Sequence, residues 1–216
     1  MPLPLQHFYM IRHGETEANA ARIMAGSLDS PLTEKGVQQA RDTIEIIQSL
    51  TIKPTKIFHS NLRRARNTAA ILNEALNCDM HETTYLAEWH AGDWEGVPYD
   101  DCPEFLEDWV NPPGGETAQE FLNRVQQGKR TALTHTPAPV LIVCHGGLFR
   151  AFGKFYDINS YGVDNCTLYE FTPDPSKTQF PWEVHKYMNR KRITREPAVI
   201  YSGLETIGSY EDAISS

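Results

Sequence analysis

Residues 8–19 read FYMIRHGETEAN, and they carry the first indication of both the fold and the site. The apolar run predicts a buried strand over residues 7–12 that ends on a cation, Arg12, and an imidazole, His13. Successive side chains of a strand point to opposite faces, so Arg12 and His13 can share a site only if the strand stops at His13. We expect Gly14 to permit the turn that brings both side chains to one edge of a sheet.

The same pattern returns at residues 139–147, PVLIVCHGG. A continuous apolar run is typical of a strand that is covered on both faces, and here it ends on His145 and Gly146. Ligands of open α/β sheets bind beyond the carboxyl ends of the strands. A single histidine there is most often held by a nearby carbonyl and does no chemistry. Two histidines in equivalent positions favour a shared site.

Strands and helices alternate along the chain, which predicts an α/β protein: a three-layer α/β/α sandwich with a largely parallel central sheet. Thr33 is the expected N-cap of the first helix, and Ser60 or Asn61 that of the second. We assign residues 1–188 to one domain and 189–216 to a C-terminal tail that is partly ordered at best. Helices are expected over 34–49, 62–76, 117–133, near 103–110 and from 146, and further strands over 56–60, 80–85, 166–171 and 182–188.

The amino-acid composition restricts the classes of binding partner and the cellular compartment that we expect. The chain has 216 residues and a net charge of −8, which gives no support for a nucleic-acid partner. No run approaches the roughly 20 apolar residues of a membrane span, and the N-terminus has no signal-peptide pattern. Cys78, Cys102, Cys144 and Cys166 form no C-x-x-C pair, so we expect a reducing, cytoplasmic environment. The sequence leaves monomer and homodimer open.

A cluster of cations opens the second helix, in SNLRRARNTA (60–69). Arg63, Arg64 and Arg66 oppose the helix macrodipole there, at roughly 0.3–1 kcal/mol each when exposed. One interpretation is a solvated face with acids nearby. The other is an anion site, made by backbone N–H groups and a guanidinium at the same sheet edge as His13.

Five motifs occur in order: RHGETEAN, SNLRRARNTA, LAEWHAGDWEG, PPGGET and VCHGG. Together, over roughly residues 8–171, the chain resembles the histidine phosphatase superfamily, in the branch that includes cofactor-dependent phosphoglycerate mutase and its phosphatase relatives. The resemblance implies that His13 attacks phosphorus and becomes phosphohistidine. It also implies that Arg12, Arg64 and His145 contact the phosphoryl oxygens and that Glu88 protonates the leaving oxygen. Arg64, and not Arg63, matches the family pattern.

The resemblance adds Asn19, Gly26 and Gly146 as phosphate- or substrate-binding positions. The family usually has Gln-Gly where this chain has Ala25-Gly26, so a polar contact is expected to be missing. Asn67 stands where Gln is common. Neither departure touches the proposed catalytic set.

General physical chemistry supports the same residues independently of the resemblance. Phosphoryl transfer depends on positioning and on positive charge around the equatorial oxygens. The nucleophile must present an unprotonated ring nitrogen, so we expect a backbone carbonyl to hold the other N–H of His13. A carboxyl group close to phosphate charge can stay protonated near neutrality, and Glu88 could later act as the base for water.

We favour hydrolysis over mutase-type transfer, because the segment after Glu88 is short, acidic and without Lys or Arg. The substrate is expected to be a small phosphate ester. Trp89, His90, Trp94 and Tyr99 are interpreted either as an aromatic wall for a ring or as packing, with equal weight. A metal hydrolase is disfavoured by the absence of metal-ligand spacing, and a regulatory binding module by the full set of competent residues. We expect no metal and no cofactor.

Overall fold

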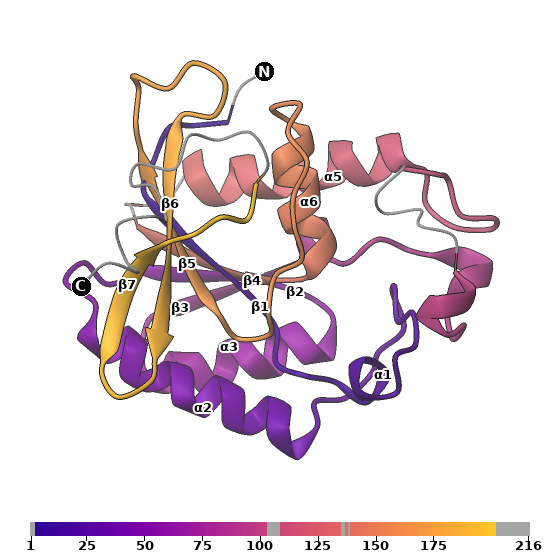
Figure 1. The fold of residues 1–216 in the computed structure, drawn as a ribbon, viewed down its shortest axis with the longest axis horizontal. Coiled ribbons are helices and arrows are strands. Elements are labelled where there is room, and N and C mark those ends of the chain that lie inside the picture. The colour runs from indigo at the N-terminus through magenta and orange to yellow at the C-terminus, as the bar shows by residue number, and fades with distance from the viewer. Residues whose placement is uncertain (1–2, 103–108, 135–136, 138, 202–216) are drawn as a thin grey trace, which may run out of the picture.

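A sheet of seven strands forms the middle layer of the protein, for which we use a computed structural model that describes residues 3–102, 109–134, 137 and 139–201 (Figure 1). The strand order is β3-β2-β4-β1-β5-β6-β7. β3, β2, β4 and β1 pair in parallel, whereas β5, β6 and β7 each pair antiparallel to the preceding strand. The strands are β1 (Phe8–Arg12), β2 (Lys56–Ser60), β3 (Asp79–Thr83), β4 (Val140–Cys144), β5 (Leu168–Pro173), β6 (Trp182–Asn189) and β7 (Ile193–Pro197).

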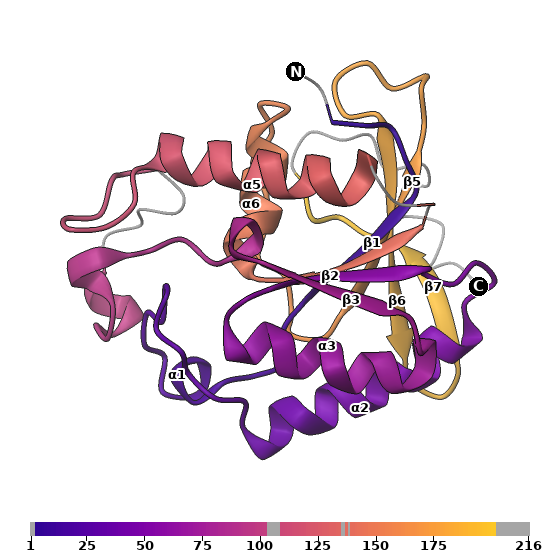
Figure 2. The same ribbon diagram turned by 180° about the vertical axis from the view of Figure 1, so that it is seen from behind.

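Helices cover both faces of this sheet, which confirms the predicted three-layer α/β architecture. One face carries α2 (Glu34–Ser49) and α3 (Arg63–Leu76), and the other carries α5 (Ala118–Thr134) and α6 (Gly146–Lys154), as Figure 2 also shows. The short helix α1 (Glu17–Ala20) follows β1. Three 3₁₀ turns, Thr84–Leu86, Gly92–Trp94 and Tyr99–Asp101, lie in the long connection between β3 and α5.

Strand β1 shows how the two faces are divided. Phe8 and Met10 pack in the core with the side chains of α5 and α6, whereas Tyr9 and Ile11 pack with those of α2 and α3. All four side chains are buried, as expected for a strand at the centre of a covered sheet. The continuous apolar run in the sequence is therefore the result of two cores, one on each side.

The helix starts were predicted correctly at one position and wrongly at another. Thr33 is the N-cap of α2, where its hydroxyl accepts a hydrogen bond from Gly36 N at 3.0 Å. Neither Ser60 nor Asn61 caps α3, because the N-cap is Leu62, which has no side-chain acceptor. Asp29, from a distant loop, instead accepts a hydrogen bond from the N–H of Arg63 at 2.8 Å.

Gly14 is needed for a different reason from the one expected. Its backbone is not in the left-handed region, which Gly26, Gly92, Gly96 and Gly114 occupy. A Cβ at Gly14 would lie 2.3 Å from the carbonyl oxygen of Gly36 on α2. Close packing between the end of β1 and the start of α2 therefore excludes a side chain.

The sheet continues past residue 188. β7 pairs antiparallel with β6, and Tyr201 forms a bridge with Ser160 in the connection between α6 and β5. The helix expected near 103–110 falls largely on residues 103–108, outside the described residues, and so do residues 202–216 of the expected tail. No helix in the described part of the chain is long and apolar enough to cross a membrane.

Candidate active site

A cavity of about 360 Å³ opens at the carboxyl ends of β1 and β4. It is where the sequence placed the site, since seven of the eight predicted site residues line it and the eighth, His145, is fully buried against the ring of His13. The seven lining residues are Arg12, His13, Asn19, Gly26, Arg64, Glu88 and Gly146.

The pairing of the two central strands brings the histidines together. Arg12 of β1 lies opposite Cys144 of β4, so the next residues of the two parallel strands, His13 and His145, are neighbours. The N–H of His13 donates to the carbonyl of Cys144 at 3.0 Å. The two imidazole rings lie 5.1 Å apart, centre to centre.

Hydrogen bonding selects the tautomer of His13. Its Nδ1 lies 2.7 Å from the carbonyl oxygen of Gly14, so Nδ1 carries the proton and Nε2 keeps its lone pair. This confirms the expected backbone carbonyl. The N–H of Gly14 in turn donates to the hydroxyl of Thr68 on α3 at 3.1 Å, and Asn165 donates to the carbonyl of His13 at 2.7 Å. Neither Thr68 nor Asn165 was identified from the sequence.

The electrostatic surroundings keep both rings neutral. Burial, and then the charges of Arg64 and Arg12, hold the pKa of His13 well below its usual value. Burial and then Arg64 lower the pKa of His145 in the same way. A neutral imidazole has a free lone pair at neutral pH without needing to lose a proton first.

Arg64 is 2% exposed and is fixed on three sides. Its Nη1 and Nη2 donate to the carbonyls of Leu28 and Gly26, both at 2.6 Å, and its Nε donates to Nδ1 of His145 at 3.2 Å. A guanidinium has five N–H donors, so two remain for a ligand.

The other two arginines of the cluster match the alternative interpretation, a solvated face. Arg63 pairs with Asp29 at 3.3 Å and Arg66 pairs with Glu82 at 2.7 Å, all of them on the surface. The cluster therefore contains one buried anion-binding candidate and two ordinary surface cations.

Two further donors are left unpaired beside His13. His145 accepts from Arg64 at Nδ1, so its proton is on Nε2, and this buried atom has no partner in the described part of the chain. Arg12 donates through Nη1 to the carbonyl of Val163 at 2.9 Å, while its buried Nε has no partner among the described residues. Buried donors without a partner are uncommon, and at a functional site they indicate the position of a ligand.

Glu88 lies at the N-terminus of α6. Its carboxylate accepts hydrogen bonds from the N–H of Gly147 at 3.1 Å and from that of Trp89 at 3.0 Å. A Cβ at Gly147 would lie 2.2 Å from Oε1 of Glu88, so this position must be glycine for the carboxylate to reach the helix. Gly146, which lines the cavity, was predicted from the sequence, whereas Gly147 was not, although both stand in HGG.

Three residues of the segment between α1 and α2, or of α1 itself, also line the cavity: Asn19, Ala25 and Gly26. Gly26 has a positive φ of 50° and offers its carbonyl to Arg64. Asn19 uses its side-chain oxygen to accept from the N–H of Thr16 in a capping box, which leaves its NH₂ group for a ligand. The methyl group of Ala25 lines the cavity where the family usually has an amide, so the expected polar contact is absent.

The proposed aromatic wall is only half present. Tyr99 lines the rim of the cavity, but His90 and Trp94 do not line it. Trp89 contributes to the lining while it stacks on Phe121, at 5.2 Å between ring centres, and is 1% exposed. Packing is thus its main role.

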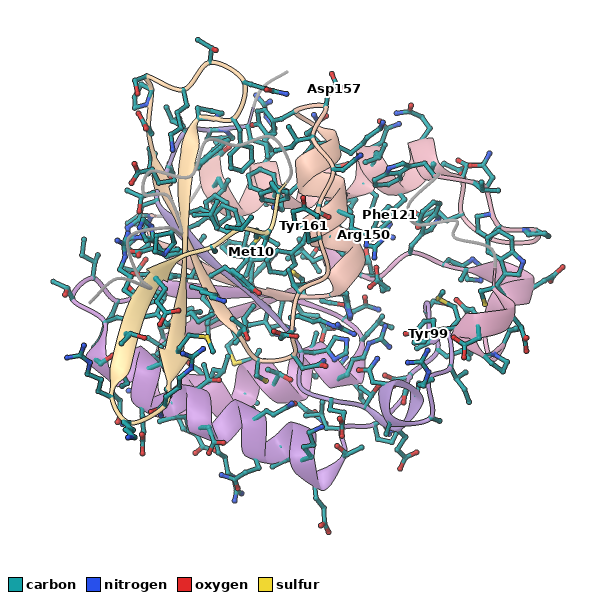
Figure 3. All side chains as sticks on the ribbon, in the orientation of Figure 1. Met10, Tyr99, Phe121, Arg150, Asp157 and Tyr161 are labelled. Atoms are coloured by element: carbon teal, nitrogen blue, oxygen red, sulfur yellow. The ribbon has the colours of Figure 1, made fainter. Side chains whose placement is uncertain are left out.

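Two residues that line the cavity on the side of α6, Arg150 and Tyr161, were not predicted from the sequence. Arg150 and Tyr161 come from α6 and from the connection after it, and Figure 3 shows them on the α6 side of the site with Tyr99 across from them. The sequence shows only that Arg150 lies about one helical turn after HGG. This spacing does not tell whether its side chain points into a cavity or to solvent.

Comparisons with known proteins agree with this geometry. The family model for the histidine phosphatase superfamily (branch 1) matches residues 8–183. The probable phosphoglycerate mutase GpmB of Salmonella choleraesuis is 39% identical over 149 residues, which are 64% of this chain and 68% of the relative.

Among solved structures, the mycobacterial glucosyl-3-phosphoglycerate phosphatase in complex with VO3 is 27% identical and has a TM-score of 0.72. The match covers 83% of this chain and 97% of that chain. TTHB049 from Thermus thermophilus is also 27% identical, with a TM-score of 0.64 and coverage of 89% and 99%. The family match spans the strands, helices and loops that form the cavity, and the chain belongs to the histidine phosphatase superfamily.

Proposed function

We propose that this protein is a phosphomonoesterase that hydrolyses a small phosphorylated metabolite through a phosphohistidine on His13. One observation carries the proposal: the Nδ1–H of His13 is held by the carbonyl of Gly14, so a neutral Nε2 is available in a cavity lined by Arg12 and Arg64. A fixed lone pair next to two cations suits in-line attack on a phosphoryl group.

In the first step, Nε2 of His13 forms a bond to phosphorus as the bond from phosphorus to the ester oxygen breaks. Glu88 gives its proton to that leaving oxygen, and the alcohol departs. Negative charge brought by the phosphate next to Glu88 favours the protonated carboxyl group in the complex. In the second step, water attacks the phosphohistidine, Glu88 takes up the proton, and inorganic phosphate leaves with His13 neutral again.

Charge on the equatorial oxygens is stabilised by groups that are already in place. Arg64 retains two N–H donors, Arg12 an unpaired Nε, and His145 an unpaired Nε2–H. Because these donors are fixed by the fold, little reorganisation accompanies the reaction. We therefore expect the activity to persist in the presence of a chelator.

Mutase-type transfer is the second candidate, since the curated relative quoted above is named a probable phosphoglycerate mutase. A mutase must protect the phosphohistidine from water and return the phosphoryl group to the substrate. The segment after Glu88 carries no Lys or Arg through residue 116, which favours hydrolysis. A purely regulatory binding role would not require a neutral, oriented His13.

The test is phosphate release in EDTA from 3-phosphoglycerate, sugar phosphates, nucleotides and an aryl phosphate, with His13→Ala as the matched variant. We expect release by the wild type and none by the variant. Full activity of His13→Ala would refute the nucleophile assignment. Exchange of phosphate between the glycerate positions without release would favour the mutase instead.

Glu88→Gln gives a second, independent test of the acid role. Its activity should fall most on esters with poor leaving groups and least on aryl phosphates, because an aryl oxide leaves without a proton. Equal losses on both kinds of ester would contradict a role for Glu88 as the proton donor.

A further inference from the structure

Glu95 does not line the cavity, but its carboxylate binds the loop that holds Arg64. Its Oε1 accepts hydrogen bonds from the N–H of Ser27 at 2.7 Å and from the N–H of Ala91 at 3.0 Å. The hydroxyl of Ser27 lies between the two carboxylate oxygens, 2.9 Å from Oε1 and 3.1 Å from Oε2. No cation pairs with this half-buried carboxylate in the described part of the chain, so N–H and O–H donors hold it.

Ser27, which Glu95 binds, stands between the two carbonyl groups that orient the guanidinium of Arg64. Nη2 of Arg64 donates to the carbonyl of Gly26 and Nη1 donates to the carbonyl of Leu28, both at 2.6 Å. A displacement of Ser27 therefore moves both carbonyls together. The direction of the guanidinium depends on where this loop lies.

The carboxylate of Glu95 and the loop at residues 25–28 are closely packed. A Cβ at Gly26 would lie 2.3 Å from Oε1 of Glu95, and the φ of Gly26 is 50°. The N–H of Leu28 donates to the carbonyl of Ala25 at 2.8 Å and closes the loop into a tight turn. The carboxylate is thus part of the packing that sets the position of this turn.

Backbone hydrogen bonds join the same two segments of the chain, but they do not reach Ser27. The N–H of Met24 donates to the carbonyl of Val97 at 2.8 Å, and the N–H of Gly96 donates to the carbonyl of Met24 at 2.9 Å. Both bonds end on Met24, three residues before Ser27. The side chain of Glu95 extends the connection from Met24 to the residues that hold Arg64.

The direction of Arg64 matters because its remaining N–H donors must meet the phosphoryl oxygens in a buried site. Hydrogen bonds between a guanidinium and an anion are directional, and they weaken steeply when the angle at the hydrogen changes. Arg64 is buried, so water cannot easily replace a misdirected donor. A small rotation of the guanidinium should therefore reduce the affinity for phosphate.

We propose that Glu95 is a positioning residue, whose carboxylate fixes the turn at residues 25–28 and thereby holds the guanidinium of Arg64 in the direction that binds the phosphoryl group. The inference rests on the proposed function for the contact between Arg64 and phosphate. Glu95 donates no proton and forms no bond in the reaction. Because Oε1 accepts from both N–H groups, the reach of the side chain should matter more than its charge.

A pair of substitutions separates reach from charge, with calorimetry of inorganic phosphate as the measurement. Glu95→Asp keeps the charge but is one methylene shorter, so its oxygens withdraw from Ser27. The Kd for phosphate should rise about 5- to 50-fold, as for two coupled groups in contact. Glu95→Gln loses the charge but keeps the reach and one acceptor oxygen, and its Kd should stay within about 3-fold of the wild type.

Asp100→Ala is the matched control. Asp100 pairs with Arg22 at 2.8 Å on the surface and so joins the same two segments, but it does not contact the turn at residues 25–28. Its removal should leave the Kd for phosphate unchanged. Urea unfolding of each variant shows that the Kd is measured on folded protein.

NMR of the Arg64 side chain gives a readout that a general loss of stability would not change. A guanidinium held at both Nη atoms rotates slowly, so its Nη–H protons give separate signals, which Arg64→Lys identifies by their loss. These signals should merge in Glu95→Asp and remain separate in Glu95→Gln.

The outcomes distinguish this inference from the proposed hydrolysis. Wild-type Kd and separate Arg64 signals in Glu95→Asp would overturn the role of Glu95, whether or not the wild type hydrolyses an ester. So would a larger rise of Kd in Glu95→Gln than in Glu95→Asp. If the expected pattern appears in a protein that releases no phosphate from any ester, the positioning role stands and the proposed hydrolysis fails.

Discussion

Thr68→Val tests whether the nucleophile is positioned from α3. Thr68 is fully buried, accepts a hydrogen bond from Gly14 N at 3.1 Å and donates to the carbonyl of Arg64 at 2.8 Å. Gly14 is also the residue whose carbonyl holds Nδ1 of His13 at 2.7 Å. The hydroxyl of Thr68 therefore holds the peptide between His13 and Gly14, next to the Gly14 carbonyl that selects the tautomer and the direction of the His13 ring.

Valine has a similar shape but cannot accept a hydrogen bond, so the N–H of Gly14 would be buried without a partner. The expected loss in the free energy of unfolding is about 1–3 kcal/mol. For a domain of this size it corresponds to a fall of about 2–12 °C in Tm. A displaced His13 should also lower kcat by about 10- to 100-fold, because the reacting atoms are no longer aligned.

The assay is urea unfolding followed by tryptophan fluorescence, together with phosphate release from the best substrate. Thr68→Ser is the control, since it keeps the hydroxyl and loses only a methyl group, at about 0.5–1.5 kcal/mol. Its kcat should stay close to that of the wild type. Wild-type stability and kcat in Thr68→Val, or an equal loss of kcat in Thr68→Ser, would refute the reasoning.

Three titratable groups give the remaining predictions. The pKa of His13 is lowered by burial and by neighbouring arginines, so its ring should stay neutral as the pH falls through 6.5, and an NMR signal that titrates at 6.5 would contradict this. Lys129 is fully buried, its Nζ lies 3.4 Å from the centre of the Phe152 ring, and burial holds its pKa well below the usual value. Lys129→Met should therefore raise the urea midpoint at pH 7, because the unfolded lysine binds a proton more readily than the buried one. The gain should be smaller at a pH above 10.5, where the unfolded lysine is neutral too. A lower midpoint would indicate a charged ammonium that the ring stabilises. Burial alone would raise the pKa of Glu170, but hydrogen bonds from His7 and Arg195 outweigh it and lower the pKa to about 2. The Glu170 carboxylate should contribute fully to the free energy of unfolding above pH 4.5, and its contribution should decrease as the pH falls towards 2. Glu170→Gln should therefore reduce the slope of the unfolding free energy against pH between these values. An unchanged slope in this variant would disprove the prediction.

Local pattern was enough to predict most of the elements of this fold. Apolar runs of five or six residues gave the buried strands β1 and β4, and amphipathic spacing gave α2, α3 and α5 within one or two residues at each end. These signals are local because burial of one face of an element makes apolar residues recur at regular spacing, and burial of both faces of a strand makes them continuous. The strand β7 was not predicted, since ITREP has no fully buried residue and none of the apolar pattern of a strand, although it pairs with β6 along its length.

The cap of one helix and the need for two of the glycines depended on segments far away in the sequence. The start of α3 uses a carboxylate from Asp29, and Gly14 is required by the backbone of Gly36. Gly147 is required by the carboxylate of Glu88. In each case the partner lies more than twenty residues away, so no local rule of turns or caps could have identified it.

For this protein, the sequence by itself determined which residue types are candidates for the site: two histidines, two arginines and a glutamate, in an order that resembles one superfamily. It could not determine their relation in space. The parallel pairing of Arg12 with Cys144 sets the two imidazole rings side by side, and burial of Arg64 separates it from its exposed neighbours Arg63 and Arg66. Strand register, burial and the direction of a side chain are properties of the packed whole, because each is decided by atoms from several segments at once. Arg150 shows the same limit, since only the packing of α6 beside the cavity makes this helical cation a lining residue.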